Sequence, residues 1–167
     1  ELLASANDEV ALLLVAVAAA RYHAGDPEGA EKAASKAVRR SEPALAGHLY
    51  LGRIRLDRGD AAGALAAAEA ALRIDRHCAP AQSLAGEALV RLDRYDEARR
   101  RVRLALDADP NYTPALVRDA EALHRAGRSS EAREALAKAF RADEDDLSVR
   151  RLLYEVEKSA LSVAAVE

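Results

Sequence analysis

The residues that could do chemistry are few and scattered along this sequence. The histidines are His23, His48, His77 and His124, and no two have the close spacing that places metal ligands together on one helix. Only His77 has a cysteine beside it, Cys78, and adjacent side chains point apart, so the pair predicts a surface turn. The sequence also has no glycine-rich phosphate loop and no glycine-flanked serine. We therefore expect no enzymatic activity, no metal site and no cofactor.

The densest charged segment is a run of arginines that could bind phosphates or nucleic acid. Its members are Arg91, Arg94, Arg99, Arg100, Arg101 and Arg103. On a helix spanning 95–108, Asp96 would pair with Arg100 and Glu97 with Arg101 at the i,i+4 spacing. A solvated outer face is the favoured interpretation, and a patch for a polyanion or an acidic protein is the alternative.

Composition excludes several classes of protein. The chain has 167 residues, 50% hydrophobic and 32% charged, as expected of one folded domain. A net charge of −3 gives no long-range attraction to nucleic acid or to an acidic membrane surface. No apolar run reaches the roughly 20 residues that cross a bilayer, and one cysteine excludes an intrachain disulfide framework. We expect no membrane insertion and a cytoplasmic location, with the periplasm as the alternative.

A period of 34 residues organises the chain when frames begin at Ala11, Leu45, Ala79 and Thr113, with a shorter frame at Leu147. Small residues recur at the eighth phase (Ala18, Gly52, Gly86, Ala120), the twentieth (Ala30, Ala64, Ala98, Ala132) and the twenty-seventh (Ala37, Ala71, Ala105, Ala139). The fifteenth phase holds Gly25, Gly59, Asp93 and Gly127, types that favour a left-handed turn. The period predicts helical hairpins that pack closely through small side chains.

The helices expected from this pattern span 8–24, 27–40, 44–58, 61–74, 79–92, 95–108, 113–126, 129–142 and 147–165. The prolines fall at or near helix starts or between helices, where a missing N–H costs little: Pro27, Pro43, Pro80, Pro110 and Pro114. The acidic turn 143–146 is expected to cap the last helix, because anions are favoured at a helix N-terminus.

These residues resemble the tetratricopeptide repeat family. In the third repeat the family's residue types stand at Gly86, Tyr95, Asp96, Glu97, Ala98, Ala105, Asp109, Pro110 and Asn111. Arg21 and Arg55 depart from the family's large eleventh residue, and Asp119 replaces a usual leucine. The resemblance implies an all-α, right-handed superhelical stack of helical hairpins. This α-solenoid would form one domain over 1–167, with repeats 11–44, 45–78, 79–112 and 113–146 and a capping helix 147–165.

By the same resemblance, the first helix of each hairpin lines a concave face that binds a partner. The residues expected there are Leu12, Val15, Ala19, Tyr22, Leu49, Arg53, Leu56, Glu87, Val90, Arg91, Val117, Glu121, His124 and Arg125. The set is apolar in the first repeat and of mixed charge in the third and fourth, which suits an extended peptide or an amphipathic helix. The apolar strip could instead be covered by residues 1–7, by a preceding repeat or by a second copy of the chain.

The expected function is that of a protein–protein interaction module, an adaptor or scaffold that binds a peptide or helical segment of a partner protein. The alternative is a regulatory or dimerisation domain of a larger enzyme, transcription regulator or secretion or pilus assembly factor; the absence of methionine favours an excised piece. A homodimer through the first repeat is a third possibility. Nucleic acid is not an expected partner.

Some members of the family clamp a C-terminal carboxylate with lysine and asparagine. The corresponding positions here are Val15, Ala19, Tyr50, Pro80 and Leu84, none of which supplies a charge or an amide. We therefore expect no binding of acidic chaperone tails through such a clamp.

Overall fold

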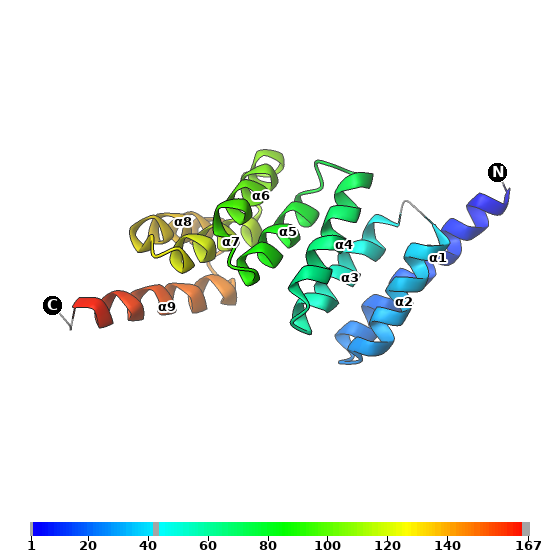
Figure 1. Ribbon diagram of the computed structural model, residues 1–167, viewed down its shortest axis with the longest axis horizontal. Helices are drawn as coiled ribbons and strands as arrows, with labels where there is room; N and C mark the ends of the chain where they lie inside the picture. Colours follow the sequence, from blue (N-terminus) through cyan, green and yellow to red (C-terminus); the bar gives the residue numbers. More distant parts are fainter. Residues whose placement is uncertain (1, 42–43, 165–167) are drawn as a thin grey trace.

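The computed structural model describes residues 2–41 and 44–164, with side chains for 6–41 and 44–159, and every regular element in these ranges is an α-helix. The helices are α1 (Leu2–His23), α2 (Pro27–Arg40), α3 (Leu45–Asp57), α4 (Ala61–Ile74), α5 (Ala79–Arg91), α6 (Tyr95–Ala108), α7 (Thr113–Arg125), α8 (Ser129–Ala142) and α9 (Leu147–Ala164). Consecutive pairs form hairpins that stack along the long axis, with α1 and α9 at opposite ends (Figure 1). The prediction of an all-α stack of helical hairpins is confirmed.

The main difference from the expected helices is at the start of the chain. α1 begins at Leu2 rather than at residue 8, so residues 2–7 form its first turns. A segment that continues a helix rises away along the axis by about 1.5 Å per residue, so it cannot fold back over the apolar strip of the first repeat. The expected end at residue 165 and the expected helix-start residue Pro43 lie outside the described residues.

Each hairpin turns on a residue with positive φ. Gly25, Gly59 and Gly127 have φ between 76° and 82°, and Asp93 holds the same place with φ 58°. The N–H of the following residue donates to a carbonyl five residues earlier, as Arg94 does to Leu89 at 2.9 Å, which satisfies the open end of the helix. The column of glycine and aspartate therefore marks the turns, as expected.

Small residues set the distance between helices within a hairpin. The alanines at the twentieth and twenty-seventh phases are buried in all four repeats. A Cβ atom added at Gly86 would lie 2.8 Å from Cγ2 of Val102 on the partner helix, closer than packed atoms approach. The two helices of a hairpin are thus as close as their backbones allow.

The twenty-seventh alanines also join one hairpin to the next. Ala71 packs in one cluster with Ala81 of α5, and Ala105 packs with Ala115 of α7. A Cβ atom added at Gly47, the equivalent residue of α3, would lie 3.5 Å from Cβ of Ala37. We call this contact, between the second helix of one hairpin and the first helix of the next, the repeat seam.

The first helices form an inner layer and the second helices an outer layer. α1 contacts α3, α3 contacts α5, α5 contacts α7 and α7 contacts α9, whereas α2, α4, α6 and α8 do not contact one another within the described residues. Rods that touch along one side of a stack and separate along the other must curve toward the touching side. The odd-numbered helices α1 to α9 therefore line the concave face.

α9 closes the C-terminal end of the core. Val149, Leu152 and Val156 are buried against α7 and α8. Asp146 caps the helix, because its carboxylate accepts from the backbone N–H of Ser148 at 2.7 Å. The hydrogen bonds from Ser148 lower the pKa of Asp146 below its usual value. The prediction that the acidic turn caps the last helix is confirmed.

Two departures from the family pattern are filled by charged contacts. Arg55 Nη1 donates to the carbonyl of Gly63 at 3.1 Å and so bridges α3 to α4. Asp119 on α7 accepts from Nε of Arg99 on α6 at 2.8 Å, and both side chains are largely buried. In each case a polar contact between neighbouring helices replaces a large side chain.

Substituting Gly86→Val tests the close contact within a hairpin. The added methyl groups would collide with Val102, and we expect a loss of about 2 kcal/mol in the free energy of unfolding, the usual scale of overpacking. The matched control is Ala66→Val on the exposed side of α4, which costs only helix propensity, about 0.5 kcal/mol. Urea unfolding monitored by circular dichroism measures both, and equal losses would contradict the packing assignment.

Candidate functional site

A network of ion pairs crosses the concave face from repeat to repeat. Arg53 on α3 donates from Nη1 to Oε2 of Glu87 on α5 at 2.9 Å. Nε of Arg118 on α7 lies 3.7 Å from the same oxygen, and Arg118 also donates to Glu121. Because Arg53, Glu87 and Glu121 are ninth residues of successive repeats, stacking brings side chains together that are 34 residues apart in sequence.

Burial covers the acids of this network more than most of its arginines. The Glu87 side chain is only 7% exposed, beneath Arg53, Arg118 and Arg91, whose Nη2 lies 3.4 Å from Oε1 of Glu87. Arg53 and Arg91 are about two-fifths exposed, and Arg125, which lies 3.9 Å from Glu121, is about half exposed. Glu87, Glu121 and Arg118 are largely covered, while Arg53, Arg91 and Arg125 reach solvent. The accessible charge in this part of the face is therefore positive, although the chain as a whole is negative.

At the N-terminal end of the face, a hydrogen bond joins the first two repeats. The hydroxyl of Tyr22 on α1 donates to Asp57, which follows it by 35 residues at the end of α3. Burial, together with this hydrogen bond, raises the pKa of Tyr22 to about 12. The contact fixes α1 against α3 at the level of the turns.

One hollow in the concave face is a pocket of about 290 Å³. It is lined by Leu49, Tyr50, Arg53, Pro80, Leu84 and Tyr112. Leucine and proline side chains form an apolar part, while two phenols and one guanidinium provide donors. Burial raises the pKa of Tyr112, which keeps that phenol protonated as a donor. We call this hollow the concave pocket.

A second groove of about 340 Å³ lies between α1 and the start of α3. Its lining includes Ala11, Leu12, Val15, Leu45 and Ala46. At its edge the hydroxyl of Ser41 donates to Asp8 at 2.7 Å. This groove is mostly apolar, in agreement with the apolar strip expected for the first repeat.

Some of the residues expected to contact a partner are buried instead. Leu56, Val90 and Val117 are at most 2% exposed and pack into the core, so their predicted role as partner contacts is wrong. Glu87 is also buried, beneath its arginines. Residues at the fifth and twelfth phases differ in exposure from repeat to repeat, because each first helix also packs against the helices beside it. Partial exposure is kept by Val15, Ala19, Tyr22, Leu49, Arg53, Glu121 and His124, while Leu12, Arg91 and Arg125 are exposed.

The outer arginine run has different partners from those expected. Glu97 accepts from Arg94 at 2.7 Å rather than pairing with Arg101, and Arg101 lies 3.6 Å from Glu69 on α4. The predicted Asp96–Arg100 pair does not form among the described contacts. The i,i+4 rule failed here because acids on the neighbouring helix and at closer spacing reach the same guanidinium groups.

Cys78 is buried, although its position in a turn predicted that it would lie on the surface. The cysteine is buried at the start of α5 and packs with Ala71 and Ala81, whereas His77 beside it is exposed. Among the described residues, no three His, Cys, Asp or Glu side chains gather into a metal-binding group. None of the helices in the described ranges has the length and hydropathy of a membrane-spanning segment.

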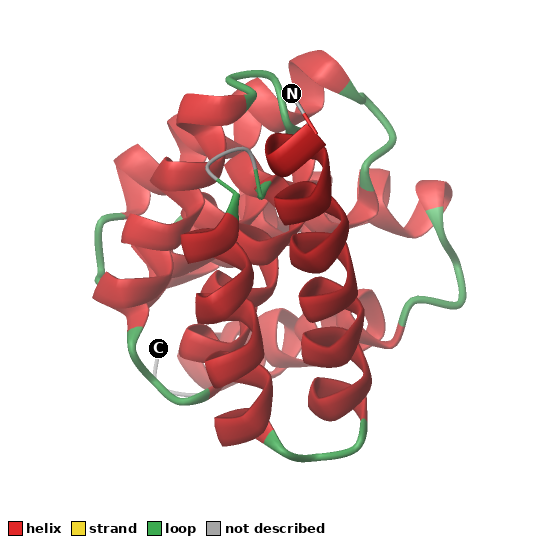
Figure 2. Ribbon diagram, turned by 90° about the vertical axis from the view of Figure 1, so that its right-hand side faces the viewer, coloured by secondary structure: helices red, strands yellow, loops and turns green. Residues whose placement is uncertain are grey.

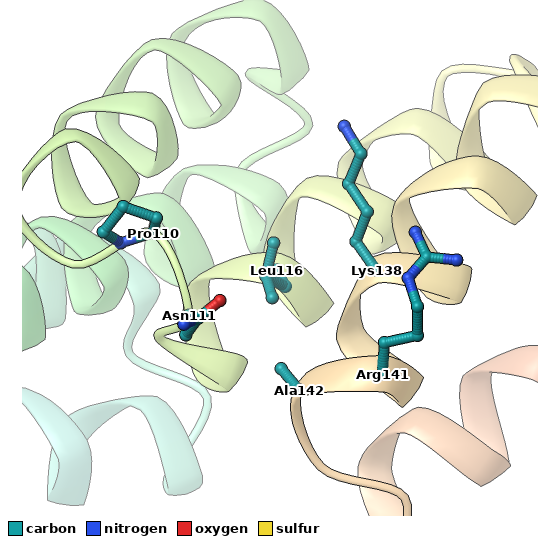
Figure 3. Close-up of a pocket in the computed structure, with 6 residues that line it drawn as sticks. All are labelled: Pro110, Asn111, Leu116, Lys138, Arg141 and Ala142. Atoms are coloured by element: carbon teal, nitrogen blue, oxygen red, sulfur yellow. The ribbon is translucent and has the colours of Figure 1, made fainter.

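Outside the concave face, a pocket of about 390 Å³ lies between the α6–α7 loop and the end of α8. Figure 3 shows Lys138 and Arg141 extending from α8, with Asn111 facing them from the loop. No ion pair joins either cation to another described residue. The pocket draws mainly on one loop and one helix, whereas the concave pocket is built by two stacked first helices and the residue that leads into a third.

Substituting Glu87→Ala tests the ion-pair network. Three arginines would lose their common acid, and we expect a loss of about 2 kcal/mol, below the range for fully buried pairs because Arg53 and Arg91 reach solvent. Glu69→Ala, which removes an exposed partner of Arg101, is the control and should cost less than about 0.5 kcal/mol. Similar urea midpoints for the two variants would show that the network adds no stability.

The Tyr22–Asp57 hydrogen bond predicts a dependence of stability on alkaline pH. The pKa of Tyr22 is raised from 10.0 to about 12 in the folded chain, so its stabilising effect is complete below pH 10 and is lost as the pH rises through about 12. The difference in free energy of unfolding between wild type and Tyr22→Phe should therefore shrink over this range. Tyr154→Phe, at an exposed tyrosine, should show no such trend. A constant difference for Tyr22→Phe would contradict the assignment.

Comparisons with known proteins agree with this architecture. Two family models, each described as a tetratricopeptide repeat, match residues 17–77 and 55–111, and together they span more than half of the chain. No match was found among curated protein sequences.

Solved structures share the fold at low identity. A thermophilic TPR protein of Thermus thermophilus matches with a TM-score of 0.82 and 18% identity, over 90% of this chain and 82% of that chain. PilF of Pseudomonas aeruginosa matches with a TM-score of 0.76 and 19% identity, over 92% and 72% of the two chains. The second TPR domain of human RPAP3, in complex with the HSP70 peptide SGPTIEEVD, matches with a TM-score of 0.57 and 18% identity, over 64% and 88%. With its 34-residue hairpins and these matching models, the chain belongs to the tetratricopeptide repeat family.

Proposed function

We propose that this chain is an adaptor or scaffold module that binds an extended or helical segment of a partner protein along its concave face. The observation that carries the proposal is the concave pocket, which stacked repeats build where exposed arginines meet an apolar hollow. Pockets of this size and mixed lining accept one or two side chains of a bound segment. Catalysis forms no part of the proposal.

The chemistry of the pocket indicates the kind of segment that fits. Leu49, Pro80 and Leu84 offer an apolar surface for a large side chain. Arg53 donates to Glu87 from Nη1, so its Nε and Nη2 can donate to a carboxylate or a carbonyl of the bound segment. Arg91 and Arg125 continue the exposed cations toward the C-terminal end. A segment with one bulky apolar residue flanked by acids fits best.

This mode differs from capture of a terminal carboxylate. Tyr50, Pro80 and Leu84 occupy positions where some members of the family hold clamp residues, and here they line the concave pocket. The pocket thus favours an internal side chain over a chain end. The peptide in the human RPAP3 complex serves as a comparison ligand, and we expect its affinity here to be unchanged when its C-terminus is amidated.

The test is a titration with a capped peptide that holds one phenylalanine between glutamates, followed by amide chemical shifts. We expect shifts at Leu49, Tyr50, Leu84 and Tyr112. Arg53→Gln keeps a donor for Glu87 but removes the charge, and should weaken binding about threefold, the scale of one exposed ion pair. Arg103→Gln on the outer layer is the matched control and should bind as wild type does.

Two outcomes would contradict the proposal. One is a set of shifts confined to α4, α6 and α8, which would put the binding surface on the outer layer. The other is equal binding of a peptide with lysines in place of the glutamates, since the exposed arginines would repel it. We also propose a cytoplasmic location, with the periplasm as the alternative, because a chain with one cysteine is compatible with a reducing compartment.

A further inference from the structure

The outward side of α1 is an unpartnered apolar face. Val10, Leu13 and Val17 are 38%, 67% and 43% exposed and follow one another at helical spacing, with the exposed Ala20 one turn further. The opposite side of the helix buries Ala11 and Ala18. α1 stands at the end of the stack, nearest the viewer in Figure 2, and no other described helix lies in front of it. We call Val10, Leu13, Val17 and Ala20 the end face.

The repeat frame shows what this side of a first helix does elsewhere in the chain. The third and tenth residues of α3, α5 and α7 are buried at the repeat seams: Gly47, Ala81 and Ala115, and Ile54, Ala88 and Ala122. Leu13 and Ala20 are the equivalent residues of α1. On α3, α5 and α7 this side of the helix is covered by another helix. On α1 the same side, the end face, is exposed and has no helix packed against it among the described residues.

The end face does not have the shape of a repeat seam. The third residue is glycine or alanine at the three inner seams, and even a Cβ atom at Gly47 would lie 3.1 Å from Cγ2 of Val38. A leucine at this position, as in α1, needs more room than a seam provides. Leu13 and the two valines instead suit a helix that packs at the wider spacing set by large apolar side chains.

The charges on α1 indicate the direction of that helix. Glu9 lies near the N-terminal end of the face, while Arg21 and His23 lie in the last turn. A second α1 placed antiparallel brings the acidic end of one copy to the basic end of the other, whereas a parallel copy would bring like charges together. If a two-fold axis passes between the two helices at the level of Val15, Leu13 of one copy lies opposite Val17 of the other, and Val10 lies opposite Ala20. The face is thus complementary to itself, as a two-fold dimer requires.

From these observations we propose that two copies of the chain associate through their α1 helices, packed antiparallel across the end face. The interface uses the end of the stack and leaves the concave pocket of each copy open. It stands independently of the proposed groove function, because no residue of the end face lines the concave pocket.

Sedimentation of the wild-type chain across a wide concentration range tests the association. We expect the mass to rise toward that of a dimer, and Leu13→Arg or Val17→Arg to remain monomeric with unchanged helicity, since both side chains are exposed. Leu147→Arg, at the 77% exposed leucine of α9, is the matched control and should dimerise as wild type does. A wild-type chain that stays monomeric throughout, or a control that dissociates as the Leu13 variant does, would overturn the proposal.

Crosslinking tests the direction of packing. Under mild oxidation a mixture of Leu13→Cys and Val17→Cys chains should form a covalent dimer, because these two residues lie opposite each other across the end face. Ala20→Cys should not, because the two cysteines would lie about 15 Å apart along the axis. The wild-type chain, whose Cys78 is buried, gives the background. Crosslinking of Ala20→Cys with itself would indicate parallel helices and would refute the antiparallel arrangement.

Discussion

The structure of this protein depends on how closely two helices can approach when only hydrogen or a methyl group separates their backbones. Glycine or alanine stands at the eighth, twentieth and twenty-seventh phases of every repeat, and the alanines at the last two are buried. Dispersion contacts fall off steeply with distance, so a core poor in large side chains must be narrow to be well packed. The chain therefore has to return to the same small residues at each turn of the stack, and the unbroken 34-residue period follows from that need.

Close packing also determines where the functional surface lies. Because the first helices contact one another and the second helices do not, the stack curves and gathers one residue from each repeat along its inner side. Arg53, Glu87 and Glu121 meet in this way, although 34 residues separate each from the next. Glu87 and Glu121 are largely covered, and the longer side chains of Arg53, Arg91 and Arg125 extend past them to solvent. An acidic chain thereby presents basic groups to whatever enters its groove.

The two surfaces described here arise from the same repeat in different ways. The concave pocket exists because several repeats stack, and its lining comes from α3, α5 and the residue that precedes α7. The end face lies on the first helix of the described stack, and it exposes a side that the later first helices bury. Their separation on the molecule allows a dimer with two open grooves, a form in which two linked binding sites can raise the overall affinity for a partner with two segments.

The sequence alone determined the helices and their turns, because these follow from local propensity and from a strict period. The expectation that the first helices line the concave face came from the resemblance to the family. Glycine and aspartate at the fifteenth phase predicted the positive φ of Gly25, Gly59, Asp93 and Gly127, and the acidic turn predicted the cap of α9. The start of α1 was missed because residues 2–7 continue the helix without a capping residue to mark its beginning.

Only the tertiary structure decided which inward residues are accessible and which charges pair. Leu56, Val90 and Val117 share phases with partly exposed residues yet are buried, because burial depends on the neighbouring helix and not on the phase alone. Arg101 lies near Glu69 rather than Glu97, and Asp119 pairs with Arg99, because contacts between helices compete with those along one helix. A period read from one chain fixes the position of a side chain on its own helix. What surrounds that side chain is set by elements distant in sequence, and the sequence does not encode their distances directly.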